Sequence, residues 1–264
     1  MNKSNSFGHN DRRRSSVIRS PLYGLISLDF LVMGDPHECP YLPGRIAREE
    51  AFRASDFPPD LYHDFMDHGF RRSGHLFYRP ACEQCSECRA LRIPVLRYKP
   101  KKSQRRILNK NRDIVVSIDS PRLSAEKHRI YADYLAVQHR SSQENSADDL
   151  YRFLYCSPVN TVELVYRLLD RIVAVGIADL SSRSLSSVYV YFDPEFSYRS
   201  LGTFSVLKEL MICRDLGVPH YYMGFLVADC SSMSYKARFE PCEILDPSFV
   251  WQPYPAATSS RSPN

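Results

Sequence analysis

The sequence predicts an α+β or α/β fold in two parts: a smaller cysteine-containing N-terminal domain and a larger domain built on a sheet. Three cysteines, Cys82, Cys85 and Cys88, lie at C-x2-C-x2-C spacing in the first part. A strongly basic segment at 97–113 follows, and strand and helix patterns then continue to Trp251. The length of 264 residues suffices for one large domain or two small ones.

The composition is that of an ordinary globular protein. Hydrophobic residues make up 44% and charged residues 25%, and the formal net charge is +5. The apolar run Leu22–Met33 contains Asp29 and is shorter than the roughly 18 residues of a membrane span. We therefore expect a cytoplasmic protein without membrane contacts. Its eight cysteines are expected to be metal ligands, reactive thiols or core residues rather than disulfides.

The N-terminal domain is predicted to span residues 21–114, after a mobile, Arg-rich polar tail at 1–20. Within it the pattern predicts a strand, a loop that turns into helix, a helix ending before Gly69, and a second strand. These elements lie, in order, at 25–32, 39–48, 59–68 and 91–95.

Four of the cysteines are candidates for one metal site. The side chains of Cys82, Cys85 and Cys88 are close enough in sequence to converge, and Cys39 is the fourth ligand that a tetrahedral site requires. A structural zinc ion or an iron–sulfur cluster would suit such a donor set. Convergence of the thiols without a metal stays open. No organic cofactor is expected.

A pair of arginines precedes the cysteine motif. In an extended segment Arg71 and Arg72 point to opposite faces, so one of them is expected to reach a substrate. A guanidinium there would bind a carboxylate through two parallel hydrogen bonds, and a structural salt bridge is the alternative. Tyr41 and Arg45, close to Cys39, are second candidates for the same pocket.

The segment 97–113 carries eight basic side chains and one acidic one, Asp113. Unpaired charges of one sign repel one another, so a phosphate-rich partner explains them better than a solvated helix face does. The candidate nucleic-acid ligands are Lys101, Lys102, Arg105 and Arg106.

The larger domain is predicted at 115–252, before a second mobile tail at 253–264. Strands are expected at 115–118, 162–169, 172–179, 187–192, 220–226 and 243–251, and helices at 125–140 and 200–217. This order is that of the GNAT acyltransferase core, where the donor's phosphates bind at the N-terminus of the helix that follows the central strand. Ser200, Gly202 and Thr203 are therefore candidate substrate ligands, although a Ser or Thr before a helix is usually an N-cap.

Seven ordered motifs carry a resemblance to a known family. They are CPYLPGRIA (39–47), HGFRRSG (68–74), YRPACEQCSECRALRIPV (78–95), SQRRILNKN (103–111), YVYFDP (189–194), SLGTFSVLKE (200–209) and YYMGFLVADCSSMSYKARFEPCEIL (221–245). From about Phe30 to Trp251 the chain resembles the bacterial aspartate/glutamate leucyltransferase branch of the arginyl-tRNA–protein transferase family. The resemblance implies transfer of leucine from Leu-tRNA to the N-terminal α-amine of proteins that begin with Asp or Glu. It also implies that the N-degron degradation machinery acts downstream.

The chemistry of such a transfer depends mainly on positioning, because an aminoacyl ester is already activated and no GxxxxGK[ST] motif is present. Asp179 would hold or deprotonate the acceptor amine, or else cap a turn at a strand end. Tyr189, Tyr191 and Tyr222 would stack the terminal adenosine, with Tyr191 close to the chemistry, or else be half-buried strand residues. Lys236 suits a phosphate or a developing oxyanion, and a surface lysine is the alternative.

Three other functions stay open at this point. The first is transfer of arginine from Arg-tRNA to the same N-termini. The second is a GNAT enzyme that uses acyl-CoA, which would need no basic segment at 97–113. The third is a non-catalytic, zinc-dependent RNA-binding protein, which would bind RNA without turnover.

Overall fold

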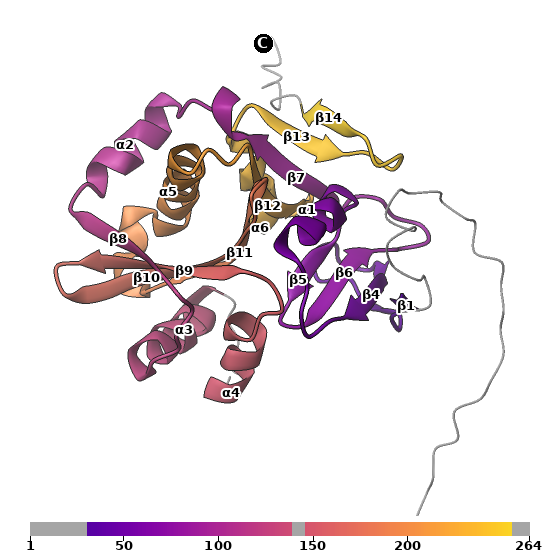
Figure 1. Cartoon of the computed structure of the whole chain (residues 1–264), viewed down its shortest axis with the longest axis horizontal. Coiled ribbons are helices and arrows are strands. Elements are labelled where there is room, and N and C mark those ends of the chain that lie inside the picture. Colours follow the sequence, from indigo (N-terminus) through magenta and orange to yellow (C-terminus); the bar gives the residue numbers. More distant parts are fainter. Residues whose placement is uncertain (1–30, 139–145, 255–264) are drawn as a thin grey trace, which may run out of the picture.

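The computed structural model of the chain describes residues 31–138 and 146–254 (Figure 1). It is a mixed α/β structure with one large mixed sheet, which confirms the predicted fold class in its general form. The predicted tail at 1–20 and most of the predicted strand at 25–32 lie outside the described residues. Within the described ranges, no helix combines the length and apolarity that crossing a membrane requires.

The large sheet has eight strands in the order β14-β13-β7-β12-β11-β10-β9-β8. Every neighbouring pair is antiparallel except β11 and β12, which are parallel. The strands are β7 (Arg89–Pro94), β8 (Ile114–Asp119), β9 (Thr161–Leu168), β10 (Arg171–Leu180), β11 (Ser184–Phe192), β12 (His220–Leu226), β13 (Cys242–Leu245) and β14 (Trp251–Tyr254). The predicted strands of this region are confirmed within one to three residues, except that the stretch 243–251 holds two elements, β13 and the start of β14.

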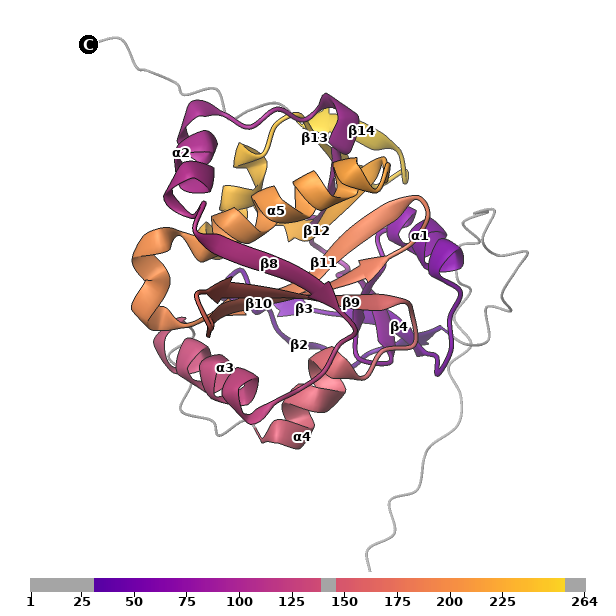
Figure 2. The ribbon, with the colours of Figure 1, turned by 60° about the vertical axis from the view of Figure 1, so that its left-hand side comes forward.

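Helices cover both faces of this sheet (Figure 2). α2 (Lys102–Lys110) and α5 (Leu201–Asp215) lie on one face, and α3 (Ala125–Gln138) and α4 (Ala147–Leu150) on the other. Each face has its own apolar core, because β10 between them is buried along nearly its whole length. Shorter helical turns connect the elements: η3 (Val95–Arg97), η4 (Tyr151–Tyr155), η5 (Pro194–Arg199), α6 (Ser231–Ser234) and η6 (Tyr235–Arg238).

A second, four-stranded sheet in the order β1-β4-β6-β5 packs against helix α1 (Pro59–Asp67). Its strands are β1 (Val32–Met33), β4 (Glu49–Arg53), β5 (Arg71–Ser73) and β6 (Leu76–Pro80). Its core is a cluster of phenylalanines that also holds Tyr222 of β12, so the two sheets share side chains. The predicted turn into helix within 39–48 is wrong, since β2 (His37–Glu38) pairs there with β3 (Ile46–Ala47).

The two predicted domains interlock at β7. This strand lies before the predicted boundary at 114, yet it is inserted between β12 and β13 of the large sheet. The division at residue 114 stays a prediction. The insertion brings the segment between Arg71 and Pro94 alongside β12, where the candidate site lies.

Candidate active site

The candidate site is a cavity of about 630 Å³ where strands β11 and β12 separate. The two strands pair over three residues only, Ser184–Ser186 with His220–Tyr222. Beyond that point β11 continues toward α3 and β12 continues toward β7, and side chains of both strands line the gap. The cavity therefore forms because β11 and β12 share no ladder hydrogen bonds beyond Ser186.

Gly224 forms part of the β12 wall. The pairing of β12 with β7 shifts register between Tyr222 and Phe225, and Gly224 adopts a φ of +78° within that shift. A Cβ there would also lie 3.6 Å from Lys236 Nζ. Glycine is required at this position because it accepts the left-handed backbone without strain.

Arg71 of β5 presents a buried guanidinium to the cavity. Its Nη1 donates to the Phe70 carbonyl oxygen at 2.6 Å, and the group lies over the rings of Tyr222 and Phe225. Its Nε is buried without a hydrogen-bond partner, and it forms no ion pair among the described residues. Burial lowers the pKa of Arg71, which remains charged at neutral pH.

Lys236 is a second buried cation on the same cavity. Its Nζ donates to the Phe225 carbonyl oxygen at 2.7 Å, and no carboxylate in the described part of the chain pairs with it. Burial, followed by the nearby charge of Arg71, lowers the pKa of Lys236 to about 8. Two positive groups that form no ion pair among the described residues make this end of the cavity suited to an anion.

Arg72 points away from Arg71 and pairs with Asp179, as expected for adjacent residues of an extended segment. Its Nε and Nη2 donate to the two carboxylate oxygens at 2.8 and 2.6 Å, and both side chains are almost fully buried. Thr161 Oγ1 donates to the same carboxylate at 2.6 Å. Asp179 is not among the residues that line the cavity, so its predicted role at the acceptor amine gains no support from the geometry.

The three predicted tyrosines have different surroundings. Tyr189 lines the cavity, where its ring contacts Tyr134 and Phe153. Tyr191 is fully buried behind it, and its hydroxyl bonds to that of Tyr155 at 2.8 Å. The hydroxyl of Tyr222 donates to Asp67. Its ring packs against the guanidinium of Arg71.

The N-terminus of α5 reaches the cavity through Gly202. Ser200 precedes the helix in a left-handed conformation, and its side chain makes no capping hydrogen bond. Thr203 lies in the first turn and does not line the cavity. The first amide groups of a helix have no intrahelical acceptors, so this end of the cavity suits a phosphate or another anion.

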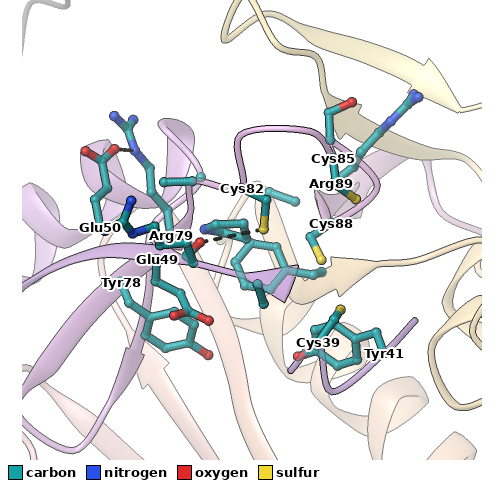
Figure 3. Close-up of a pocket in the computed structure, with 18 of the residues that line it drawn as sticks. Cys39, Tyr41, Glu49, Glu50, Tyr78, Arg79, Cys82, Cys85, Cys88 and Arg89 are labelled. Carbon is teal, nitrogen blue, oxygen red and sulfur yellow. Dashed lines mark hydrogen bonds and ion pairs between the residues drawn. The ribbon is translucent and has the colours of Figure 1, made fainter. Parts of the chain in front are cut away.

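The four predicted metal ligands line a neighbouring cavity of about 380 Å³ (Figure 3). Cys82, Cys85 and Cys88 come from the β6–β7 loop, and Cys39 comes from the opposite wall beside Tyr41. Burial and the neighbouring thiols raise the pKa of Cys88 to about 12, a repulsion that a bound cation would relieve. By donor type alone, four thiols would suit a zinc ion or an iron–sulfur cluster.

The thiols are nevertheless not drawn together. In the described part of the chain, no group of three or more His, Cys, Asp or Glu side chains is arranged to hold a metal ion. Arg45 Nη1 donates to Cys85 Sγ at 3.2 Å, so Arg45 faces the cysteines and not the anion-binding cavity. Tyr41 lines both cavities and forms part of the wall between them.

The basic segment forms α2, whose side chains Lys102, Arg105 and Arg106 are exposed. Its charges are not all unpaired, contrary to the sequence-based expectation: Lys101 pairs with Glu240 at 3.0 Å, and Arg97 approaches Glu243 at 3.8 Å. The C-terminal end of α2 is joined to the turn before α5, because Asn111 Nδ2 donates to the Arg199 carbonyl oxygen. The basic surface therefore adjoins the α5 end of the cavity.

Three polar residues of the site were missed from the sequence. Ser187 and Tyr221 line the cavity, and the Tyr221 hydroxyl donates to a buried carboxylate, that of Glu209 in α5. Glu209 and Ser205 stand four residues apart on one helix face, a spacing that signals a polar pair within an otherwise apolar stripe.

Comparison with known proteins places the chain in a family. The N-terminal and C-terminal models of the arginine-tRNA-protein transferases match residues 37–106 and 126–246. The chain is 34% identical over 226 residues to the aspartate/glutamate leucyltransferase of Campylobacter jejuni strain RM1221, a match that covers 84% of this chain and 94% of that one. The namesake of Chromohalobacter salexigens is 36% identical, covering 80% and 87%, and that of Halorhodospira halophila 37%, covering 80% and 91%.

The chain therefore belongs to the arginine-tRNA-protein transferase family. The predicted family resemblance is confirmed, and with it the prediction that the protein is an aminoacyltransferase.

Proposed function

We propose that this protein transfers leucine from Leu-tRNA to the N-terminal α-amine of proteins that begin with Asp or Glu. The observation that carries the proposal is Arg71, a buried guanidinium on the cavity wall that lacks a carboxylate partner among the described residues. Three relatives that each cover 80% or more of this chain are named aspartate/glutamate leucyltransferases. A substrate that brings its own carboxylate completes the environment of Arg71.

The acceptor's side chain lies against Arg71 in this proposal. A carboxylate would pair with the Arg71 guanidinium through a charge-assisted hydrogen bond, while an amide would leave the buried cation without a counter-charge. The rings of Tyr222 and Phe225 hold the guanidinium plane in place, so little side-chain entropy is lost on binding. Selection for Asp and Glu over Asn and Gln follows from this arrangement.

The aminoacyl-tRNA approaches from the opposite end. The exposed basic residues of α2 contact phosphates of the acceptor stem, and the terminal nucleotide enters past the α5 N-terminus at Gly202. Tyr189, on the cavity wall, offers a ring for the terminal adenine. In this arrangement the aminoacyl ester lies between the two cations, Arg71 and Lys236, and the ring of Tyr189.

The reaction is a direct aminolysis. The acceptor nitrogen forms the new C–N bond at the ester carbonyl carbon, the C–O bond to the ribose breaks, and the ribose oxygen takes up a proton. Lys236, with its ammonium held by the Phe225 carbonyl oxygen, stabilises the negative charge that develops on the carbonyl oxygen. Neither ATP nor an organic cofactor takes part in this scheme.

The GNAT-like core, the metal site and the cellular location are part of the same proposal. A sheet that opens between two parallel strands, with a helix N-terminus at the opening, is the arrangement expected of a GNAT-like core. The cysteine cavity would hold a structural zinc ion or iron–sulfur cluster in the smaller domain. The protein would act in the cytoplasm and pass its leucylated products to the degradation machinery.

A donor-competition assay tests the function. The purified protein is incubated with a peptide that begins with Asp and with radiolabelled Leu-tRNA, Arg-tRNA or acetyl-CoA in separate reactions. Label is expected in the peptide from Leu-tRNA alone. Label from Arg-tRNA alone would identify arginine, and not leucine, as the transferred amino acid. Label from acetyl-CoA alone would point to the acyl-CoA-dependent alternative.

A further inference from the structure

Glu209 is a carboxylate enclosed in the protein beneath the cavity. It is fully buried, and no basic side chain of the described residues forms an ion pair with it. Its hydrogen-bond donors are hydroxyl groups: Ser205 Oγ contacts Oε1 at 2.7 Å, and the Tyr221 hydroxyl contacts Oε2 at 2.7 Å. A buried acid without a counter-charge is able to exchange a proton with such partners, as catalytic sites require.

Two hydroxyls connect this carboxylate to the cavity. Tyr221 of β12 donates to Glu209 and also lines the cavity, and Ser187 of β11 lines the cavity and hydrogen-bonds to the same carboxylate. Both residues lie beside the point where β11 and β12 stop pairing. A substrate bound where the strands separate would therefore lie next to the two residues whose hydroxyls contact Glu209.

The other groups that face Glu209 are neutral at neutral pH. They are Tyr166 of β9, Tyr221 of β12, Tyr235 after α6, and Cys213 in the next turn of α5, while β10 and β11 face Glu209 with the non-titratable residues Gly176 and Ser187. Burial raises the pKa of each, to about 12 for Tyr235. Burial also raises the pKa of Glu209, while the hydroxyl donors oppose the shift.

We propose that Glu209 accepts, through the Tyr221 hydroxyl, the proton that the acceptor amine loses during aminoacyl transfer. The inference rests on the function proposed above and makes Glu209 a positioning residue that acts through Tyr221. As the C–N bond forms, the amine proton moves to the Tyr221 oxygen and the Tyr221 proton moves to Glu209. The same path then returns one proton as the C–O bond breaks and the ribose oxygen is protonated, so no further reactant is needed.

The test compares Glu209→Gln, Glu209→Asp and Tyr221→Phe in the full-length protein. Glu209→Gln keeps the size of the side chain but cannot take up the proton, so kcat is expected to fall by about a hundredfold or more with KM for peptide and tRNA within about twofold. Glu209→Asp keeps a carboxylate and should retain more activity. The double variant Glu209→Gln/Tyr221→Phe should lose no more than either single variant, because the two residues act as a unit.

The matched control is Tyr98→Phe, which removes a buried hydroxyl that donates to Gln104, outside the Glu209 network, and does not line the cavity. Its kcat should stay near that of the parent. The pH profile gives the readout that a structural role would not move. In the parent, the acidic limb of the kcat profile should include the deprotonation of Glu209, and Glu209→Gln should lose that limb while keeping the limb set by the acceptor amine at about pH 8.

The outcomes separate this inference from the proposed function. A parent that transfers no amino acid from any charged tRNA overturns both. An active parent whose Glu209→Gln variant keeps kcat within about threefold, or keeps the same acidic limb of the kcat profile, overturns the role of Glu209 alone. A Tyr221→Phe variant with parental kcat would do the same.

Discussion

Replacing Asp179 by Asn keeps the shape of the side chain and removes the charge that Arg72 contacts through two nitrogens. The Arg72 side chain is 0% exposed and that of Asp179 is 2% exposed, so the change leaves a guanidinium buried without a counter-charge. Removing one partner of a buried ion pair costs about 3–5 kcal/mol of folding free energy. In a protein of this size that is a fall in Tm of roughly 6–20 °C.

The assay is thermal unfolding followed in parallel with transfer kinetics. The double variant Arg72→Met/Asp179→Asn should lose less than the sum of the two single losses, because neither charge is then left alone. Asp215→Asn, at the exposed C-terminal end of α5, is the control and should change stability by less than about 0.5 kcal/mol. An Asp179→Asn variant that keeps the parental Tm but loses kcat would refute this reasoning and restore Asp179 as a catalytic residue.

Three more predictions follow from the same geometry. Replacing Lys102, Arg105 and Arg106 by Gln should raise KM for tRNA and reduce its salt dependence, with little effect on KM for the peptide; an unchanged salt slope would make α2 a solvated surface. kcat should fall as the pH rises through about 8 and Lys236, which stabilises the developing oxyanion, loses its proton, and Lys236→Arg should move that fall to higher pH; kcat measured over pH 7–9 checks this. The purified protein should contain about one bound metal centre per chain, and Cys82→Ser and Cys88→Ser should each lose it; metal-free protein with full stability would contradict a structural metal at the four cysteines.

The sequence predicted much of the large sheet, because its strands and helices carry local patterns. The apolar runs at 172–179 and 220–226, and the glycine after helix α5, are signals that depend on neighbours in the chain alone. The insertion of β7 between β12 and β13 left no such signal. It depends on pairing between residues more than a hundred positions apart, for instance Arg92 with Tyr222 and Glu243.

The sequence identified several residues that line the cavity, but it predicted fewer of their contacts. The spacing of Arg71 and Arg72 predicted that only one would reach a substrate; both line the cavity, and only the fold reveals that Arg72 is held by the distant Asp179. Lys236 was identified as a possible anion ligand, while its burial beside Arg71 emerged only from the fold. Glu209 was missed because a glutamate on a helix is normally solvent-exposed; its spacing from Ser205 is a local signal, but nothing local reveals that Tyr221 of a distant strand encloses it.

The most direct measurement of the central claim compares peptides that begin with Asp and with Asn, using Leu-tRNA and the Arg71→Lys variant. An ammonium cannot reproduce the planar, stacked contact of the guanidinium, so the variant should lose about 1.5–3 kcal/mol toward the Asp peptide, roughly ten- to over a hundredfold in kcat/KM. The Asn peptide should be a poor substrate for the parent and nearly unaffected by the change. Arg53→Lys, on the exposed edge of β4, is the control and should behave as the parent. Equal losses for both peptides, or no loss for either, would contradict the assignment of Arg71 as the residue that reads the acidic N-terminus.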